Sequence, residues 1–181
     1  MLLEKFAPDL FVKSIYHIDL EELKKRGITT IITDLDNTLI AAKSKEYTPK
    51  LIKWLDDLQE TGFKVIIVSN NNQTRVSEFA EPLTVPYIHR ARKPVKTSFQ
   101  KALEKLNSNP KETVVIGDQL LTDIYGGNRM GLYTILVNPI SNVEGLGTKI
   151  NRSIERILIP KMRKRGLLAW EEKNNGGTKI L

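Results

Sequence analysis

Residues 28–40, ITTIITDLDNTLI, decide the fold that we expect for this chain. The first half is a β-branched run, which is typical of a strand buried on both faces of a parallel sheet. Two carboxylates, Asp34 and Asp36, follow it. Side chains two residues apart in an extended segment face the same way, so both acids are expected in the crevice beyond the strand. Such a pair repels unless a cation offsets it, and Mg²⁺ fits this position, although Asp-x-Asp is also common at turns without a catalytic role.

The same alternation of short β-branched runs and amphipathic stretches continues along the chain. Thr48 and Pro49 predict a helix start, and Gly62 predicts its end. This rhythm predicts one doubly wound α/β domain with a parallel sheet, in which ligands bind at the carboxyl ends of the strands. The predicted strands are residues 28–33, 63–68, 86–88, 113–116 and 133–137.

Length and composition limit the classes of protein to which the chain can belong. The 181 residues, 40% apolar and 27% charged, suit one compact domain with a short appendage and argue against global disorder. The absence of cysteine excludes disulfides, a cysteine nucleophile and thiolate metal sites. The chain has no apolar run of signal-peptide or membrane-spanning length, so we expect a cytoplasmic protein.

The net charge of +7 comes almost entirely from one segment. Lys149 to Arg165 holds seven basic residues against a single acid, Glu155. We therefore expect an N-terminal helical extension (1–27), an α/β core (28–148) and a basic amphipathic C-terminal segment with a tail (149–181).

Polar residues follow the other predicted strands too. Each has a structural alternative: Ser69 and Asn70 could cap a helix, Lys93 could be solvated, and an acid at a helix start is favoured by the helix dipole. Taken together in chain order, they supply a carboxylate nucleophile, acids for a metal, a hydroxyl and amide cradle and a lysine. Phosphoryl transfer requires this set. The runs are Ser69-Asn70, Lys93-Pro94, and Gly117-Asp118 with Asp123.

These motifs resemble the haloacid dehalogenase-like (HAD) phosphatases over residues 28–138. The sequences DLDNTL (34–39) and ARKP (91–94) are similar to the class IIIA, YqeG-type branch, which is related to phosphatidylglycerophosphate (PGP) phosphatases. Asn37 stands where many members have glycine.

The resemblance implies a role for each site residue. Asp34 would be the nucleophile that forms an aspartyl-phosphate, and Asp36 would be the general acid and then the base. The magnesium ion would be held by Asp34, the Asp36 carbonyl and Asp118, with Asp123 beside them. The phosphate-binding residues would be Ser69, Asn70 and Lys93.

The spacing of the motifs leaves no room for an inserted cap domain. Only 35 residues separate Asp34 from Ser69, and 24 separate Ser69 from Lys93. An open site suits a large substrate or one that is part of a surface: a protein, a nucleic acid terminus or a lipid headgroup. PGP at the inner face of the membrane is the substrate that the branch resemblance favours.

The C-terminal segment allows two interpretations. At helical spacing, Ile150, Ile154 and Ile157 fall on one side and Arg152 on the other, with Pro160 ending the helix. The isoleucines could pack on the sheet and leave the arginines solvated, or the segment could bind an anionic membrane peripherally.

Two other classes of protein remain to be weighed. The basic segment suits an RNA-binding module with a vestigial phosphatase site, but no aromatic residue lies within 149–165 to stack on bases. A receiver domain also uses a phosphorylated aspartate, Mg²⁺ and lysine. Its phosphorylated aspartate ends the third strand, where this chain has only His89 and Arg90.

Overall fold

The β-branched runs form one parallel sheet in the computed structural model, which describes residues 3–142 and 146–168. The strand order is β1-β6-β5-β2-β3-β4, and all neighbours pair in parallel. The doubly wound α/β fold is thereby confirmed. The strands predicted from sequence correspond to β2 (Thr30–Thr33), β3 (Lys64–Val68), β4 (Tyr87–Ile88), β5 (Thr113–Gly117) and β6 (Tyr133–Val137).

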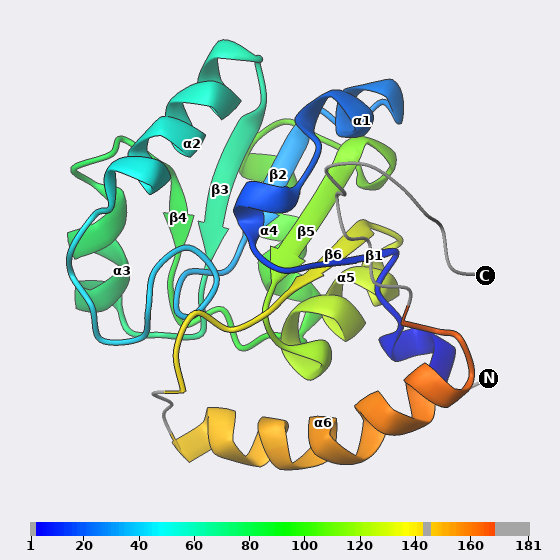
Figure 1. Ribbon diagram of the computed structural model, residues 1–181. Coiled ribbons are helices and arrows are strands. Elements are labelled where there is room, and N and C mark those ends of the chain that lie inside the picture. Colours follow the sequence, from blue (N-terminus) through cyan, green and yellow to red (C-terminus); the bar gives the residue numbers. More distant parts are fainter. Residues whose placement is uncertain (1–2, 143–145, 169–181) are drawn as a thin grey trace.

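The register of the central strands brings their carboxyl ends together. Thr33, the last residue of β2, pairs with Ile67 of β3 on one side and with Ile116 of β5 on the other. The loops that follow these three strands therefore leave the sheet at one edge, the lower edge in Figure 1.

Helices cover both faces of the sheet. On one face, Trp54 and Phe79 belong to the apolar core that includes Ile31 and Ile67; on the other, Phe99 packs in a cluster with neighbouring strand residues. The first face carries α1 (Leu20–Lys25), α2 (Pro49–Glu60) and α3 (Gln73–Ala80), and the second carries α4 (Lys96–Lys105) and α5 (Tyr125–Met130). Short helical turns complete the chain: η1 (Leu3–Phe6), η2 (Ile15–His17), η3 (Pro110–Glu112) and η4 (Leu120–Ile124).

The N-terminal segment differs from the helical extension expected for residues 1–27. Leu10–Val12 forms β1, an edge strand paired with β6, and both Phe11 and Val12 are buried. A run of three residues is too short to show a strand period in the sequence. The pairing with β6 satisfies its backbone, so this segment belongs to the sheet.

The C-terminal helix α6 (Leu146–Lys164) runs beneath the carboxyl edge of the sheet (Figure 1). Pro160 lies inside this helix, so the expectation that it ends the helix is wrong. Met162, two residues further on, is fully buried in a cluster with Phe11 and Leu136, and this packing offsets the backbone hydrogen bond that proline cannot donate. The predicted tail, residues 169–181, and the side chain of Lys149 lie outside the described residues.

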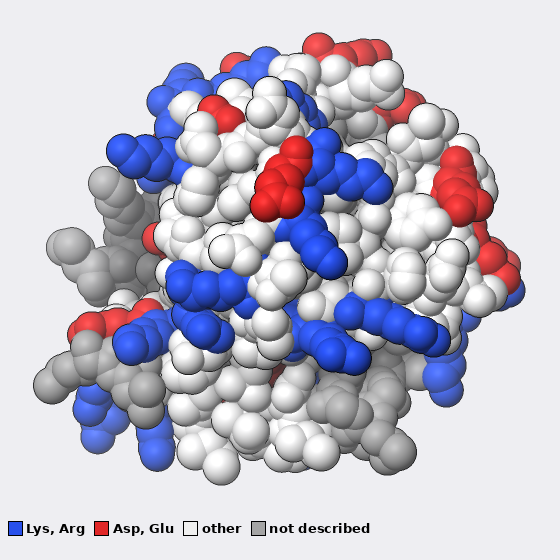
Figure 2. All heavy atoms as spheres, turned by 180° about the vertical axis from the view of Figure 1, so that it is seen from behind, with Lys and Arg blue, Asp and Glu red and all other residues white. Residues whose placement is uncertain are grey.

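Basic side chains also gather outside α6. Figure 2, seen from behind, shows Lys and Arg spread over that face of the molecule with few acids among them. The loop after β4 and helix α4 contribute exposed basic residues. These are Arg90, Arg92, Lys96, Lys101 and Lys105.

Candidate active site

Three aspartates converge at the carboxyl edge of the sheet. Asp34, Asp118 and Asp123 are all buried, and each offers a carboxylate oxygen within 4.8 Å of the others. Asp34 follows β2, and its N–H donates to the carbonyl of Ile116 at 2.9 Å. The parallel register therefore brings Asp34 next to two acids that lie more than eighty residues further along the chain.

The backbone between β5 and α5 is shaped to admit Asp123. Asp123 lies in the π-helical turn η4, and its Oδ2 accepts the Gln119 N–H at 3.2 Å. A Cβ on Gly117 would overlap the Asp123 carboxyl group. Only glycine at this strand end allows so close an approach.

Lys93 joins two of the acids. Its Nζ lies 2.8 Å from Asp34 Oδ1 and 2.6 Å from Asp123 Oδ1, with 3% of the side chain exposed. This geometry places Lys93 directly beside Asp34. The alternative of a solvated lysine is excluded.

Burial sets the protonation of the cluster. It raises the pKa of Asp34 to about 6, against the attraction of Lys93, and raises the pKa of Asp118 to about 8, with the charges of Asp34 and Asp123 adding to it. Burial disfavours the charge on Lys93, but Asp123 and Asp34 outweigh it and raise the pKa of Lys93. Ionising all three aspartates together is therefore costly without a further cation.

The Asp36 carboxylate forms an ion pair with Arg75. Its Oδ1 accepts from Arg75 Nε at 3.0 Å and Nη2 at 2.8 Å, and its Oδ2 accepts from Asn71 Nδ2 at 2.8 Å. The Asp36 side chain is therefore not one of the three clustered acids. This leaves its main-chain carbonyl as the group that our prediction assigns to the metal.

Asn70 bonds Lys93, and neither Ser69 nor Asn70 caps the following helix, whose N-cap is Asn72. The Asn70 side chain is anchored on the Lys93 backbone: Oδ1 accepts its N–H at 2.7 Å and Nδ2 donates to its carbonyl at 3.2 Å. Ser69 is buried, and its Oγ accepts the Asn71 N–H at 3.2 Å. The capping interpretation of these two residues is therefore wrong.

Asn37 has a backbone reason for standing where many family members have glycine. Its φ is 65°, in the left-handed region that glycine and asparagine tolerate best. Its Oδ1 accepts from the Ala42 N–H at 3.1 Å and from Ser141 Oγ at 2.7 Å. The side chain thus fastens the loop that carries Asp34 and Asp36.

Sequence analysis missed three charged residues at the site. Arg75 comes from α3 and carried no local signal. Arg152 was placed on the solvated side of the C-terminal helix, yet it donates to Asp118. Glu155 was noted only as the single acid of the basic segment, yet it is buried. The spacing of Arg152 and Glu155, one helical turn apart, was the available signal.

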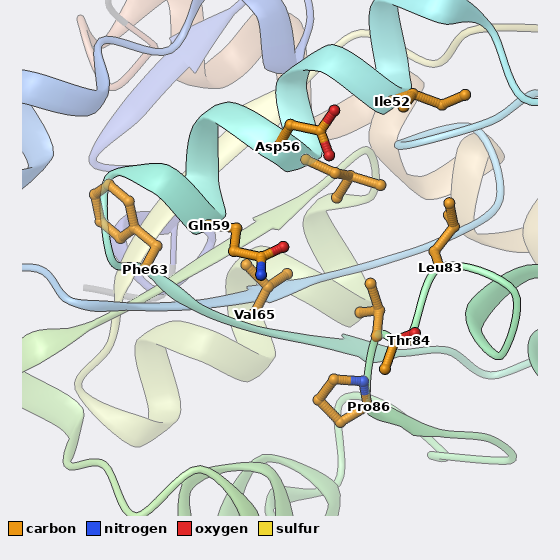
Figure 3. Close-up of a pocket in the computed structure, with 10 residues that line it drawn as sticks. Ile52, Asp56, Gln59, Phe63, Val65, Leu83, Thr84 and Pro86 are labelled. Atoms are coloured by element: carbon orange, nitrogen blue, oxygen red, sulfur yellow. The ribbon is translucent and has the colours of Figure 1, made fainter.

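A separate hollow lies at the opposite edge of the sheet. It has a volume of about 250 Å³ and lies between α2 and the amino ends of β3 and β4. Figure 3 shows Ile52, Asp56 and Gln59 of α2 across from Leu83, Thr84 and Pro86. With one carboxylate and a mainly apolar lining, it lacks the groups that phosphoryl transfer needs.

The donor set of the acidic cluster fits a hard divalent cation. Mg²⁺ prefers carboxylate and carbonyl oxygens and keeps several waters. Three aspartates and one lysine leave a net charge of about −2 when all are ionised, which a divalent ion neutralises. Burial is the main cause of the raised pKa values of Asp34 and Asp118, and the charges of the neighbouring acids add to it.

The fold and this site together define a HAD-type phosphatase, a phosphoric monoester hydrolase. The fold is also found in a Legionella pneumophila protein assigned to subfamily III A of the HAD hydrolases. The TM-score is 0.50 at 20% sequence identity, over 80% of this chain and 90% of that one.

The chain belongs to the PGP phosphatase family, whose model, described as mitochondrial PGP phosphatase, matches residues 3–141. It is 48% identical to the probable phosphatase YqeG of Bacillus subtilis, over 95% of this chain and 100% of that protein. It is 27% identical to phosphatidylglycerophosphate phosphatase 1 of Arabidopsis thaliana, over 88% of this chain and 49% of the plant protein.

Proposed function

We propose that the chain is a Mg²⁺-dependent hydrolase of phosphatidylglycerophosphate that acts through an aspartyl-phosphate at the membrane surface. The observation that carries the chemistry is the buried cluster of Asp34, Asp118 and Asp123 around Lys93. The relatives named as PGP phosphatases support the choice of substrate.

Asp34 is the proposed nucleophile. A carboxylate oxygen of Asp34 attacks phosphorus, the bond from phosphorus to the leaving alkoxide breaks, and water later releases phosphate from the aspartyl group. Lys93 holds Asp34 Oδ1 in place and offsets the repulsion between its charge and the incoming phosphate. Bound Mg²⁺, held by Asp34, Asp118 and the Asp36 carbonyl with Asp123 beside it, would supply charge neutralisation of the phosphoryl group.

Asp36 is the proposed acid and base. It gives a proton to the leaving alkoxide and in the second step takes one from the attacking water. Arg75 and Asn71 donate to its two oxygens and so fix the orientation of the carboxylate. When Asp36 carries the proton for the leaving group, the protonated oxygen no longer accepts from its present donor. The Ser69 hydroxyl and the Asn70 N–H are the proposed donors to the phosphate oxygens.

The intervals between the site loops hold no inserted domain. Residues 35–68 form α2 and β3, and residues 70–92 form α3 and β4. The predicted absence of a cap in these intervals is confirmed. A site without a cap suits a headgroup presented by a membrane surface.

A substrate panel tests this function. With Mg²⁺ present, we expect phosphate release from vesicles that contain phosphatidylglycerophosphate to exceed release from a nucleotide, a sugar phosphate or a phosphopeptide by at least about tenfold in kcat/KM. Chelation of the metal should stop release. Equal or faster hydrolysis of the phosphopeptide or the nucleotide would contradict the lipid assignment while leaving the phosphatase chemistry intact.

The outer face of α6 is the proposed membrane contact. Ile150, Ile154 and Ile157 are 65%, 40% and 59% exposed, so the interpretation in which they pack on the sheet is wrong. The same line along the helix continues with the exposed Lys161 and Lys164. An apolar stripe next to basic residues favours insertion into an anionic lipid surface. No helix among the described residues is long and apolar enough to cross a membrane.

Vesicle flotation tests this contact. Replacing Ile150 and Ile157 with serine should lower partition onto anionic vesicles at least about tenfold, because two exposed isoleucines no longer insert. Ile52→Ser, which removes a 41% exposed isoleucine from α2, is the matched control and should float like the parent. Equal flotation of the double variant and the parent would exclude this face as the contact.

A further inference from the structure

The three successive residues that follow β5 each bond a different side chain of α6. Arg152 Nη1 donates to the Asp118 carbonyl at 2.7 Å, and Nη2 donates to Asp118 Oδ2. Asn151 Nδ2 donates to Gln119 Oε1 at 2.9 Å. Glu155 Oε1 accepts the Leu120 N–H at 2.6 Å. The inner face of α6 is therefore bonded along the loop that presents Asp118 to the cluster.

Arg152 and Glu155 form an ion pair that lies between α6 and this loop. Arg152 Nη1 lies 2.7 Å from Glu155 Oε2, and their side chains are 14% and 3% exposed. Removing a buried pair from water is costly, and packing between a helix and a loop does not require it. The pair instead fits a role at the carboxylate that it contacts.

The contacts of Asp118 show what that role is. Oδ2 accepts from Arg152, and Oδ1 accepts from Thr38 Oγ1 at 3.2 Å. Each carboxylate oxygen offers two lone pairs, so an oxygen that accepts one hydrogen bond can still ligate a metal. Arg152 holds both the main chain and the side chain of Asp118, which restricts the carboxylate to one orientation.

The charge of the pair is suited to a position beside a metal ligand. A lone guanidinium near the cluster would repel a divalent cation. Glu155 cancels that charge at 2.7 Å, so the pair orients Asp118 without adding net positive charge next to the ion.

We propose that Arg152, supported by Glu155, is a positioning residue that holds Asp118 in its metal-ligating orientation, so that α6 completes the site from outside the core. This inference rests on the function proposed above. Partners of metal ligands in other proteins typically account for ten- to hundredfold in metal affinity.

Calorimetric titration of Mg²⁺, without substrate, tests the proposal. Arg152→Gln should raise the Kd for Mg²⁺ about 10- to 100-fold, while kcat largely recovers at saturating Mg²⁺. The Kd of Arg152→Lys for Mg²⁺ should lie between the values for Arg152→Gln and the parent, because an ammonium group cannot bond the Asp118 carbonyl and carboxylate together as a guanidinium does. Arg152→Lys also keeps the test possible if Arg152→Gln does not fold.

Arg26→Gln is the matched control. Arg26 forms an exposed ion pair with Glu22 of α1, with Arg26 Nε 3.1 Å from Glu22 Oε1. The Arg26→Gln variant therefore loses the same charge as Arg152→Gln, but at a position that does not touch the site. Its Mg²⁺ affinity and turnover should equal those of the parent. The comparison separates loss of a helical Arg–Glu pair from loss of the contact with Asp118.

The possible results separate this proposal from the proposed function. Tighter Mg²⁺ binding by Arg152→Gln would show that Arg152 competes with the ion, and unchanged binding would show that α6 only packs; either result overturns the positioning role alone. A loss of kcat that excess Mg²⁺ does not restore also overturns it. A parent protein that binds no Mg²⁺ overturns both proposals.

Discussion

Replacing Asp34 with asparagine is expected to lower kcat by at least about 10³-fold, because an amide cannot attack phosphorus to form the aspartyl intermediate. The Asp34 carboxylate is fixed by the 2.8 Å contact with Lys93 Nζ. Asp118 is held instead by Arg152 and Thr38, and Asp123, which Lys93 also contacts, lies in η4. Phosphate release under saturating substrate and Mg²⁺ is the measurement.

The same variant is expected to be no less stable than the parent. Burial raises the pKa of Asp34 to about 6, which means that the ionised form is disfavoured in the fold, and a neutral amide removes this cost. Asp57→Asn is the control, since Asp57 forms an exposed ion pair with Lys53 on α2. Residual activity within tenfold of the parent would rule out Asp34 as the nucleophile.

Replacing Lys93 with methionine is expected to destabilise the protein by about 3–5 kcal/mol, because it leaves Asp34 and Asp123 buried without their shared cation. For a chain of this size, the loss corresponds to a decrease of about 6–20 °C in the midpoint of thermal unfolding. Calorimetric or circular-dichroism melting in the absence of metal measures it.

Melting with and without Mg²⁺ distinguishes two causes of the lower stability of Lys93→Met, the loss of charge and the loss of packing. A divalent ion at the cluster replaces part of the missing charge, so saturating Mg²⁺ should stabilise Lys93→Met by more degrees than it stabilises the parent. Lys101→Met, at an exposed position of α4, should melt like the parent with or without metal. An equal metal-induced increase in both Lys93→Met and the parent would indicate that Lys93 acts through packing alone.

The strands and the acidic loops were predictable because their signals are local. The runs that became β2, β3, β5 and β6 are β-branched and bounded by turns, and Asp34 and Asp118 follow them directly. Parallel pairing then has one simple consequence, namely that residues at strand ends meet at one edge. Leu10–Val12 was missed because three residues carry no period, and its strand exists only through pairing with β6.

Arg75 shows the limit of this reasoning at the site. It lies within a helix that packs on the sheet, and nothing in its sequence neighbours distinguishes it from the exposed arginines of the chain. Its contact with Asp36 Oδ1 at 2.8 Å depends on the position of α3 relative to the loop after β2. Only the folded arrangement of both segments determines that distance.

The sequence by itself determined the class of fold, the order of the site residues and the helical nature of the C-terminal segment, since each depends on spacing along the chain. Only the tertiary structure decided which side of α6 faces the protein. The sequence left open whether Ile150, Ile154 and Ile157 are buried or face outwards. The fold leaves them exposed, buries Glu155 and Met162 and turns Arg152 towards Asp118. The physical reason is that the loop after β5 offers a carboxylate, a carbonyl and an N–H that need polar partners, and α6 supplies them.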